Sequence, residues 1–484
     1  MTKPNILWIC TDQQRWDTLS CLGFQGARTP HIDALAADGT VFTRAYTQSP
    51  ICTPSRATFL TGMYPVAHQV QRNGNEGFPG HLTLVPKLFK QAGYATGLIG
   101  KLHLSAAEAR IEERPDDGYD EFYWSQHAAP DWDSGHDYQN WLAERGVDAK
   151  AEFARQSGLV TSPLPAEHHQ VSWARERADS FIRRHADEPW LLSINVFDPH
   201  PPFDPPRSYL DRFRPEDMPA PAFAESDLEK YQRFAGVDQQ AGSAVDPRVR
   251  PTGESKGGTH DRPPTEYDVP ALRAAYFAMI AQIDDMVGAL MATLAETGQT
   301  RDTLVIFMSD HGEMLGDHGL LYKGCRFYDG LVRVPLVISW PGAFLKGIVS
   351  EALVELVDLP ATLLEAAGLA LPDQNQGRSL VGLLTGQADP AHHKPYVLCE
   401  YFDAINVADR VGSRGTMYCD GRYKIAVYHD AGEGELYDLD NDPQELDDLW
   451  HQPEFRKVRD ELIHKHFSAM MMVTGAGPAR VADY

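Results

Sequence analysis

The sequence predicts an α/β fold: a doubly wound, mainly parallel sheet sandwiched by helices, followed by a smaller C-terminal α+β subdomain with antiparallel strands. Three observations support this prediction. Short, almost uninterrupted apolar runs recur between residues 5 and 340, as expected for strands that are buried on both faces of a parallel sheet. Segments with helical periodicity alternate with these runs. Polar residues directly follow several of the runs, and ligands of such folds bind at the carboxyl ends of the strands.

The length and the charge of the chain limit its organisation and its partners. At 484 residues it is too long for one ordinary core, and we predict a large domain over residues 1–390 and a smaller one over residues 391–484. Lys and Arg number 44 against 68 Asp and Glu, which gives a formal net charge of −24. This excess of negative charge argues against binding to nucleic acid or to an anionic membrane surface. An anionic substrate would therefore need a local cluster of positive charge or a metal ion.

The cysteines and the N-terminal residues favour a cytoplasmic setting. The six cysteines are widely spaced and include no C-x-x-C pair, so they do not form a disulfide framework. Residues 1–4 lead directly into an apolar run, without the segments of a secretory signal. No run reaches the ~18 apolar residues that a membrane span needs. We therefore expect a cytoplasmic protein without a membrane anchor, and a homo-oligomer is left open.

The strands and helices of the large domain are predicted in alternation. Buried strands are expected at residues 5–10, 95–99, 190–197, 303–308 and 334–340. Helices are expected at residues 29–36, 84–92, 171–185 and 271–296. Residues 201–270 are rich in Pro, Gly and charge, and they predict a long surface excursion, either a lid or an interface arm.

The pattern changes in the last fifth of the chain. Short strands are expected at residues 396–400, 415–419, 423–428 and 435–438, with turns between them. A helix is expected over residues 453–471. These elements predict the antiparallel subdomain.

A short helix is predicted over residues 54–61, in the most informative stretch of the chain. Pro54 suits the first turn of a helix, and Gly62 suits the position just past its end. Cys52 would then lie just before the N-terminus, where an anion meets free backbone N–H groups and the positive end of the helix dipole. Taken alone, a cysteine here would be a buried thiol in a helix-capping loop.

The longer run around Cys52 carries more information. Cys-Thr-Pro-Ser-Arg at residues 52–56, continued by Ala-x-x-Leu-Thr-Gly at residues 57–62, resembles the signature of the type I sulfatases. The resemblance covers most of residues 1–345 and implies an alkaline phosphatase-like fold. It also implies that a maturation enzyme oxidises Cys52 to formylglycine, whose hydrated aldehyde is the nucleophile that hydrolyses sulfate monoesters.

Two pairs of polar residues form a candidate metal site. Asp12-Gln13 and Asp310-His311 each follow a predicted buried strand, and their oxygens and imidazole suit a divalent cation, with modified Cys52 adding another oxygen. Carboxylates at strand ends are also common without a metal, but these positions match the metal-binding places of the sulfatases. Many members have Asp where Gln13 stands, and Asn is often found in place of His311. Oxygen ligands favour Ca²⁺, and a histidine nitrogen also admits Mn²⁺.

Four further groups stand where the family keeps its anion-binding and proton-transfer residues. Lys101 and His103 in Gly-Lys-Leu-His resemble the family's Gly-Lys-x-His. His200 in Pro-His-Pro-Pro-Phe is similar to its Pro-His-x-Pro-Phe. Lys323 follows His311 at the sequence separation at which the family has a lysine that contacts the sulfate. Each of these residues alone could be a solvated surface group.

The resemblance assigns each group a role. The metal and three cationic side chains are expected to hold the sulfuryl oxygens while the hydrate attacks sulfur: Arg56, Lys101 and Lys323. His200 is expected to protonate the leaving oxygen, and His103 to accept the proton released when sulfate is expelled. Asn73 is a weaker candidate for a substrate-binding amide, because a turn formed by Asn73-Gly74 explains it as well.

Two other functions stay open. Gln13 and the run Asp-Gln-Gln-Arg-Trp-Asp around it resemble the phosphonate monoester and phosphodiester hydrolases of the same superfamily. Lys101 and His103 argue against that branch, whose members tend to have neutral hydroxyl residues there. A protein that binds anions through an unmodified Cys52, without turnover, is the third interpretation.

Overall fold

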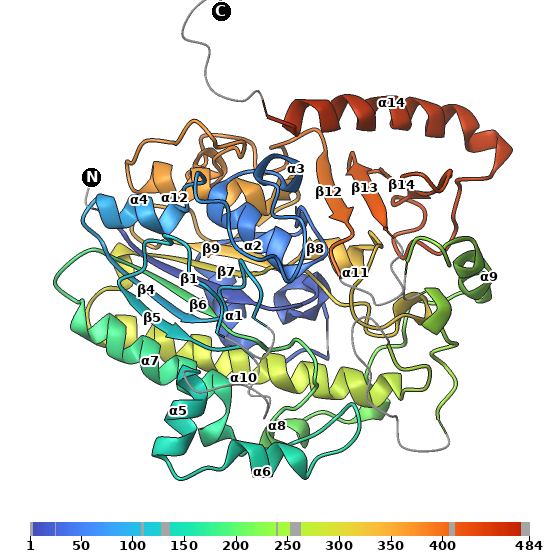
Figure 1. The fold of residues 1–484 in the computed structure, drawn as a ribbon. Coiled ribbons are helices and arrows are strands. Elements are labelled where there is room, and N and C mark those ends of the chain that lie inside the picture. Colours follow the sequence, from blue (N-terminus) through green and yellow to red (C-terminus); the bar gives the residue numbers. More distant parts are fainter. Residues whose placement is uncertain are drawn as a thin grey trace, which may run out of the picture.

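The computed structural model describes residues 3–24, 26–107, 111–126, 136–238, 241–251, 263–405 and 412–475. Its main feature is an eight-stranded sheet with the order β10-β2-β9-β7-β1-β6-β4-β5 (Figure 1). The strands, in chain order, are β1 (Asn5–Thr11), β2 (Thr40–Phe42), β4 (Ala95–Gly100), β5 (Glu121–Trp124), β6 (Trp190–Asn195), β7 (Thr303–Ser309), β9 (Leu336–Ser339) and β10 (Ile348–Ser350).

This sheet is parallel at its centre. β1 pairs in parallel with both β6 and β7, and β4 continues the parallel order between β6 and β5. β9 is antiparallel to β7 and to β2, so it is the strand that runs against the other seven. The mainly parallel α/β class predicted from the sequence is confirmed.

β1 explains why the sheet is covered on both faces. Because successive side chains of a strand point to opposite faces, Ile6 and Trp8 enter one core and Leu7 and Ile9 the other. The first core includes α2 (Cys52–Thr61), α4 (Val85–Gln91) and α12 (Leu359–Ala366). The second includes α1 (Pro30–Ala37), α7 (Gln170–Arg184) and α10 (Val269–Glu296). Figure 1 shows the sheet between these two helical layers.

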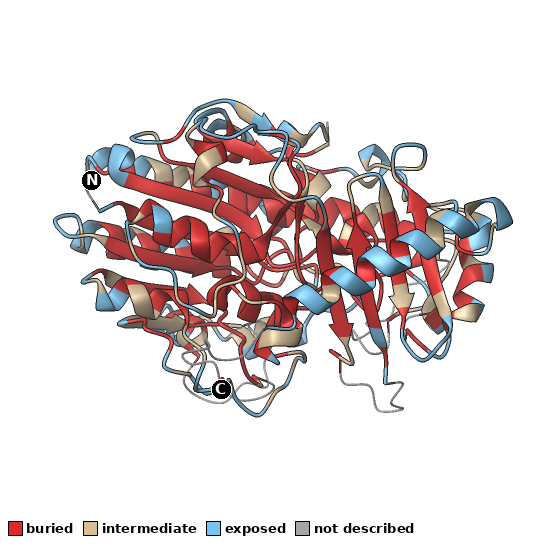
Figure 2. Cartoon of the chain, turned by 90° about the horizontal axis from the view of Figure 1, so that it is seen from above, coloured by how far each residue is buried: buried red, intermediate tan, exposed pale blue. Residues whose placement is uncertain are grey.

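A second, antiparallel sheet follows in the order β12-β13-β14-β15. Its strands are β12 (Val397–Phe402), β13 (Arg414–Cys419), β14 (Tyr423–Tyr428) and β15 (Glu433–Asp438). One face packs against α14 (Arg456–Val473), whose outward face is exposed in Figure 2. The other face packs against residues of the large domain, including Phe327 and Tyr328. The antiparallel C-terminal elements are therefore confirmed, and the boundary at residue 390 stays a prediction.

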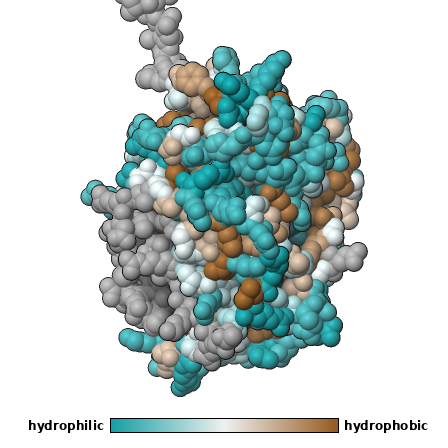
Figure 3. All heavy atoms as spheres, turned by 90° about the vertical axis from the view of Figure 1, so that its right-hand side faces the viewer, coloured by the Kyte–Doolittle hydropathy of each residue, from teal (hydrophilic) through white to brown (hydrophobic). Residues whose placement is uncertain are grey.

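The predicted excursion at residues 201–270 contains α8 (Arg207–Leu210) and α9 (Glu225–Arg233) within its described part. α9 is joined to the C-terminal sheet, because Arg233 forms an ion pair with Asp448 at 2.7 Å and Phe234 stacks edge-on against Tyr428. This part of the excursion therefore packs against the C-terminal sheet. Figure 3 shows the face on this side of the molecule, which is mainly hydrophilic where described residues form it.

The long helix α10 is apolar enough to span a membrane by composition, since an 18-residue window of it has a mean hydropathy of 1.4. However, 72% of that window is buried inside the protein. α10 packs along α7 and contacts α1 and α8. Among the described residues it is the one helix that meets the length and hydropathy criteria, and its burial is that of a core helix.

Two details of the predicted elements are wrong. The helix expected at residue 54 begins at Cys52, because the first four N–H groups of a helix have no partner inside it and Pro54 therefore loses no bond there. The strand expected at residues 334–340 is divided into β8 (Arg333–Val334) and β9, which belong to different sheets. A three-stranded sheet, β11-β3-β8, was not predicted, because its strands β3 (Ala45–Tyr46) and β11 (Val354–Glu355) are two residues long.

Candidate active site

Helix α2 presents Cys52 at the carboxyl edge of the large sheet. All ten of its residues are buried, and its first main-chain hydrogen bond joins the N–H of Ser55 to the carbonyl of Ile51 at 3.2 Å. The side-chain oxygen of Asn73 accepts from the N–H of Thr53 at 3.0 Å and so caps the free N-terminus. Gly62 ends the helix with φ = 74°, a left-handed conformation that favours glycine. Both ends of the helix that begins with Cys52 are thus fixed.

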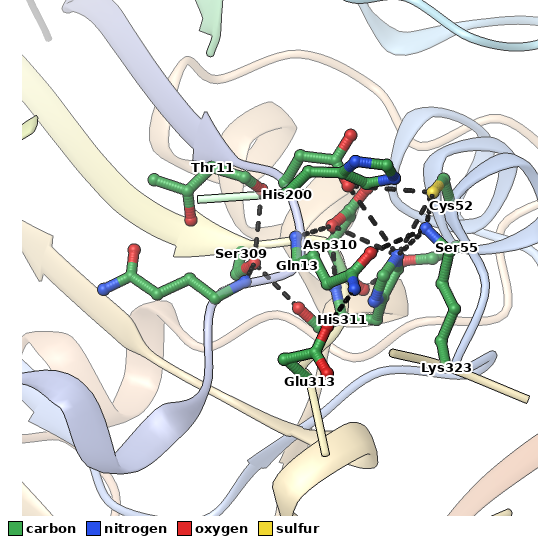
Figure 4. Close-up of polar contacts among 12 residues, drawn as sticks. Thr11, Gln13, Cys52, Ser55, His200, Ser309, Asp310, His311, Glu313 and Lys323 are labelled. Atoms are coloured by element: carbon green, nitrogen blue, oxygen red, sulfur yellow. Dashed lines mark hydrogen bonds and ion pairs between the residues drawn. The ribbon is translucent and has the colours of Figure 1, made fainter. Parts of the chain in front are cut away.

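The ends of β1 and β7 bring the predicted metal ligands together. Asp310 N–H donates to the carbonyl of Thr11 at 3.2 Å, and the Ser309 hydroxyl donates to the carbonyl of His311 at 2.9 Å. Ser55 of α2 donates its hydroxyl to the carbonyl of Asp310 at 2.6 Å, which fastens the helix to β7 (Figure 4). Two strand ends and one helix start therefore meet at one point.

The Cys52 sulfur lies where the ends of β1 and β7 meet the start of α2. Lys323 Nζ donates to Cys52 Sγ at 2.8 Å, and His311 Nε2 lies 3.2 Å from the same sulfur. Asp12 Oδ1 lies 3.7 Å from it. One ligand atom from each of Asp12, Cys52, Asp310 and His311 lies within 4.8 Å of the others, as the predicted metal set requires. Figure 4 shows Lys323 and His311 beside the Cys52 sulfur.

The donor set itself fits a divalent cation. The carboxylates of Asp12 and Asp310 are completely buried, and the side-chain oxygen of Gln13 faces the same space. His311 Nδ1 lies 2.9 Å from the carbonyl of Gly312, so Nδ1 carries the hydrogen and Nε2 is left as a ligand. Oxygen-rich sites of this kind suit hard cations such as Ca²⁺, and the imidazole also admits Mn²⁺.

Two cationic side chains support the carboxylates. Lys101 Nζ donates to Asp12 Oδ2, and Arg56 Nε donates to Asp310 Oδ2 at 2.9 Å. Arg56 Nη1 also donates to the carbonyl of Lys101 at 2.9 Å. Its Nη2 lies 3.7 Å from Asp12 Oδ2, so the Arg56 guanidinium contacts both buried carboxylates.

His103 lies on a loop that leaves β4 through Gly100. A Cβ at Gly100 would lie 2.0 Å from the carbonyl oxygen of Asn195, so only glycine allows this close approach. The loop is held by the buried carboxylate of Glu112, which accepts from the N–H groups of His103 (2.7 Å), Leu104 and Ser105 (3.1 Å). His103 itself has φ = 58°, a conformation that is uncommon for a non-glycine residue and frequent at functional sites.

His200 follows β6 and completes the set of side chains around Cys52. Its ring packs on Phe197 with 4.4 Å between centroids. Its Nδ1 lies 2.7 Å from the carbonyl of Pro201, which leaves Nε2 for the site, where it interacts with Cys52. The structure thus brings together all the residues predicted for the metal and for catalysis, and it places Asn73 at the N-terminus of α2.

The cationic groups govern the ionisation of Cys52. Burial alone would raise the pKa of the thiol, but the charges of Lys101, Lys323 and His311 outweigh it and hold the pKa well below its ordinary value. The cationic groups therefore favour the thiolate form of the unmodified residue.

The carboxylates and the histidines also have shifted pKa values. Burial and the neighbouring Asp12 raise the pKa of Asp310, whereas Lys101 holds the pKa of Asp12 low in spite of its burial and of Cys52. Burial and the nearby lysines lower the pKa values of His103 and His200 to about 4. A negatively charged ligand at the site would raise both histidine pKa values.

Two buried carboxylates were missed by the sequence analysis. Glu112 holds the His103 loop, and Glu313 accepts from the side-chain amide of Gln13. The role of Glu112 is not visible in the sequence, because no motif lies next to this residue. Glu313 directly follows Asp310-His311-Gly312, and that position could have suggested it.

Comparisons with known proteins agree with this geometry. The model of the sulfatase family matches residues 4–369, which is most of the chain. The chain belongs to the sulfatase family. A second family model, the C-terminal region of N-sulphoglucosamine sulphohydrolase, matches residues 316–471. This membership makes the protein a sulfuric ester hydrolase of the alkaline phosphatase superfamily, which acts on small sulfate esters.

Individual relatives cover nearly the whole sulfatase. It is 29% identical to the arylsulfatase of Clostridium perfringens, over 95% of this chain and 93% of that one. It is 30% identical to the uncharacterized sulfatase YidJ of Escherichia coli, over 96% and 86% of the two chains. Among solved structures it resembles the phosphonate monoester hydrolase of Agrobacterium radiobacter, with a TM-score of 0.80, 27% identity and coverage of 97% and 96%.

Proposed function

We propose that this sulfatase hydrolyses sulfate monoesters with a formylglycine made from Cys52 and with one bound divalent cation. The observation that carries the proposal is the convergence of Lys323, His311 and Asp12 on the Cys52 sulfur, at the start of a buried helix. Oxidation of Cys52 requires a separate maturation enzyme as a partner. Once oxidised, residue 52 supplies a hydrated aldehyde, with one hydroxyl to attack sulfur and a second to release sulfate.

The cation would be held by four side chains and by the oxygen of residue 52: Asp12, Gln13, Asp310 and His311. We propose Ca²⁺ as the first candidate and Mn²⁺ as the second, because three of the four side chains offer oxygen. When bound, the cation lowers the pKa of an oxygen ligand and stabilises negative charge on the transferred group. The sequence predicted that Arg56 holds the sulfuryl oxygens. Because its guanidinium is bound to Asp310 and to the carbonyl of Lys101, we propose instead that it orients the Asp310 carboxylate.

The remaining residues act on the ester itself. Lys101 and Lys323 place two ammonium groups beside residue 52, where they would stabilise the charge on the sulfuryl oxygens. His200 is proposed as the acid for the leaving oxygen, and His103 as the base for the second hydroxyl. Their low pKa values belong to the ligand-free site, and the bound anion would raise them toward the working pH.

A second activity, on phosphonate monoesters and phosphodiesters, is favoured by one observation. The similarity to the phosphonate monoester hydrolase of Agrobacterium radiobacter extends over 97% of this chain. These esters carry one negative charge, as sulfate monoesters do. We propose them as secondary substrates. Phosphate monoesters, with nearly two charges, are proposed as inhibitors, because tight ground-state binding does not lower the barrier from the bound state.

The test is kcat/KM for the four ester classes with one common leaving group. We expect the sulfate monoester to lead. If a phosphonate or phosphodiester leads by more than tenfold, about 1.4 kcal/mol in barrier, the second activity is the main one. His103→Ala should slow turnover of the sulfate ester strongly, and unchanged turnover would remove His103 from the mechanism.

A further inference from the structure

Glu313 is a completely buried carboxylate next to the metal ligands, and the mechanism above does not use it. It lies between β7 and the segment that carries Lys323. Glu313 Oε1 accepts from the N–H of Leu315 at 3.0 Å and from the N–H of Tyr322. Glu313 Oε2 accepts from the side-chain amide nitrogen of Gln13 (Figure 4). Both carboxylate oxygens are therefore committed to N–H donors.

The Gln13 amide has opposite partners at its two ends. Its nitrogen donates to Glu313, and its oxygen accepts from Lys323 Nζ at 2.8 Å. An ammonium group can only donate hydrogen bonds, so Lys323 takes the amide oxygen, and the amide nitrogen is left to donate to Glu313 Oε2. In that orientation the oxygen lies on the side of the Lys323 ammonium, which is also 2.8 Å from Cys52 Sγ and 3.4 Å from His311 Nε2, and the nitrogen faces away.

This orientation matters because an amide has one metal-binding end. The oxygen can bind a cation, but the NH₂ group of the flipped amide would present hydrogens to it. An aspartate at position 13 would have no such problem, since both of its oxygens can bind. A glutamine therefore needs a neighbour that recognises its nitrogen.

We propose that Glu313 is a positioning residue that holds the Gln13 amide with its oxygen toward residue 52 and so completes the donor set for the cation. The inference rests on the proposed divalent cation. The same carboxylate also fixes the backbone at Tyr322, which precedes Lys323. One buried side chain thus sets the positions of a metal ligand and of a sulfate-binding lysine.

The test uses substitutions that keep the shape of each side chain. In Glu313→Gln, the two backbone N–H groups hold the new amide oxygen in place of Oε1, so the new NH₂ faces Gln13. The Gln13 amide then either flips, which turns its nitrogen toward the cation and toward the Lys323 ammonium, or keeps its nitrogen against the new NH₂. Either arrangement weakens the donor set for the cation. We expect the affinity for Ca²⁺ and for Mn²⁺, measured by competition with a chromophoric chelator, to fall 10- to 100-fold.

The exchanged pair tests whether orientation is the cause. In Gln13→Glu with Glu313→Gln, the carboxylate at position 13 accepts from the NH₂ at position 313 and turns its other oxygen to the cation. The net charge and the number of heavy atoms are those of the parent protein. We expect the double variant to regain the parent affinity within threefold or to exceed it.

Glu112→Gln is the matched control. Glu112 is also buried and accepts from three backbone N–H groups beside the site, but it does not contact Gln13. We expect its metal affinity to equal that of the parent. Thermal unfolding of the metal-free proteins identifies any variant that fails to fold.

The outcomes separate the inference from the proposed function. Parent affinity in Glu313→Gln, or no recovery in a folded double variant, would overturn the role of Glu313 and leave the cation in place. If the parent protein itself binds neither cation, the metal-dependent function fails and this role fails with it. If Glu313→Gln does not fold, recovery of affinity in the double variant still supports the role.

Discussion

Two ionic clusters in this sulfatase contain the same types of side chain but have different roles. The subdomain cluster joins β14 of the C-terminal sheet to the large domain and consists of Asp329, Arg333, Lys424 and Glu445. Lys424 Nζ donates to Asp329 and, at 2.8 Å, to Glu445, while Arg333 Nη1 lies 3.2 Å from Asp329. Each charge in this cluster has an opposite charge as its nearest partner.

The active-site cluster is arranged around the Cys52 sulfur. It consists of Asp12, Cys52, Arg56, Lys101, Asp310, His311 and Lys323. Lys101 and Lys323 both act on the Cys52 thiol, although like charges repel, and Asp12 raises the pKa of Asp310 for the same reason. Like charges lie close together in the subdomain cluster as well, where burial and Asp329 raise the pKa of Glu445 to about 7. The two clusters differ in the group at their centre: Lys424 Nζ is an ammonium paired with two carboxylates, whereas the Cys52 sulfur is a nucleophilic group that both cations and a carboxylate surround.

The largest expected effect comes from removing one carboxylate from each cluster. Asp310→Asn should lose the cation and lower kcat/KM by at least about 1,000-fold, about 4 kcal/mol, because one ligand is lost. Asp329→Asn should keep the metal and keep kcat/KM within threefold. Metal analysis of the desalted proteins, together with kinetics, checks both. Normal metal content in folded Asp310→Asn would contradict the assignment.

A smaller effect, on stability, is expected from Lys424→Met. It leaves Asp329 and Glu445 buried next to each other, and breaking a buried pair costs about 3 kcal/mol. The control is Lys346→Met, because Lys346 pairs with Asp38 at 2.8 Å but is 53% exposed and should contribute less than about 1 kcal/mol. Urea unfolding measures both, and equal losses would show that the subdomain cluster does not stabilise the fold.

The smallest effect concerns Glu400, a buried carboxyl of β12 that belongs to neither cluster. Burial and the nearby Glu355 raise its pKa to about 8, although a hydrogen bond from the N–H of Val66 acts to lower this pKa. The folded protein therefore holds a proton that the unfolded chain releases above pH 4.5, so stability should fall as the pH rises from 4.5 to 8. Glu400→Gln should flatten this dependence and add about 1–3 kcal/mol at pH 8. An identical pH slope in both proteins would show that Glu400 is ionised in the fold.

Much of this molecule follows from local sequence patterns. β1, β4, β6 and β7 were predicted because each is a continuous apolar run, and α2 because Pro54 suits its first turn and Gly62 the position after its end. The two-residue strands β3 and β11 were missed because so short a strand has no period to detect. The reversed direction of β9 was missed because strand direction depends on the connections and not on the strand itself.

The site was predictable where its residues stand in motifs. Asp12, Lys101, His200 and Asp310 follow strands that end at the same edge of the sheet, and the fold brings such ends together. The roles of Glu112 and Glu313 depend on hydrogen bonds formed only after folding. The capping role of Asn73 likewise depends on its contact with Thr53, which lies in another element of the fold.

The most direct test of the account is the mass of the tryptic peptide of residues 45–56 from active protein. The proposed mechanism predicts that the thiol-bearing side chain of Cys52 is replaced by the lighter formylglycine, and that activity rises in proportion to the modified fraction. Cys52→Ala, which cannot be modified, should fold and be inactive. Full activity toward sulfate esters in protein whose peptide retains an intact cysteine would contradict the central claim.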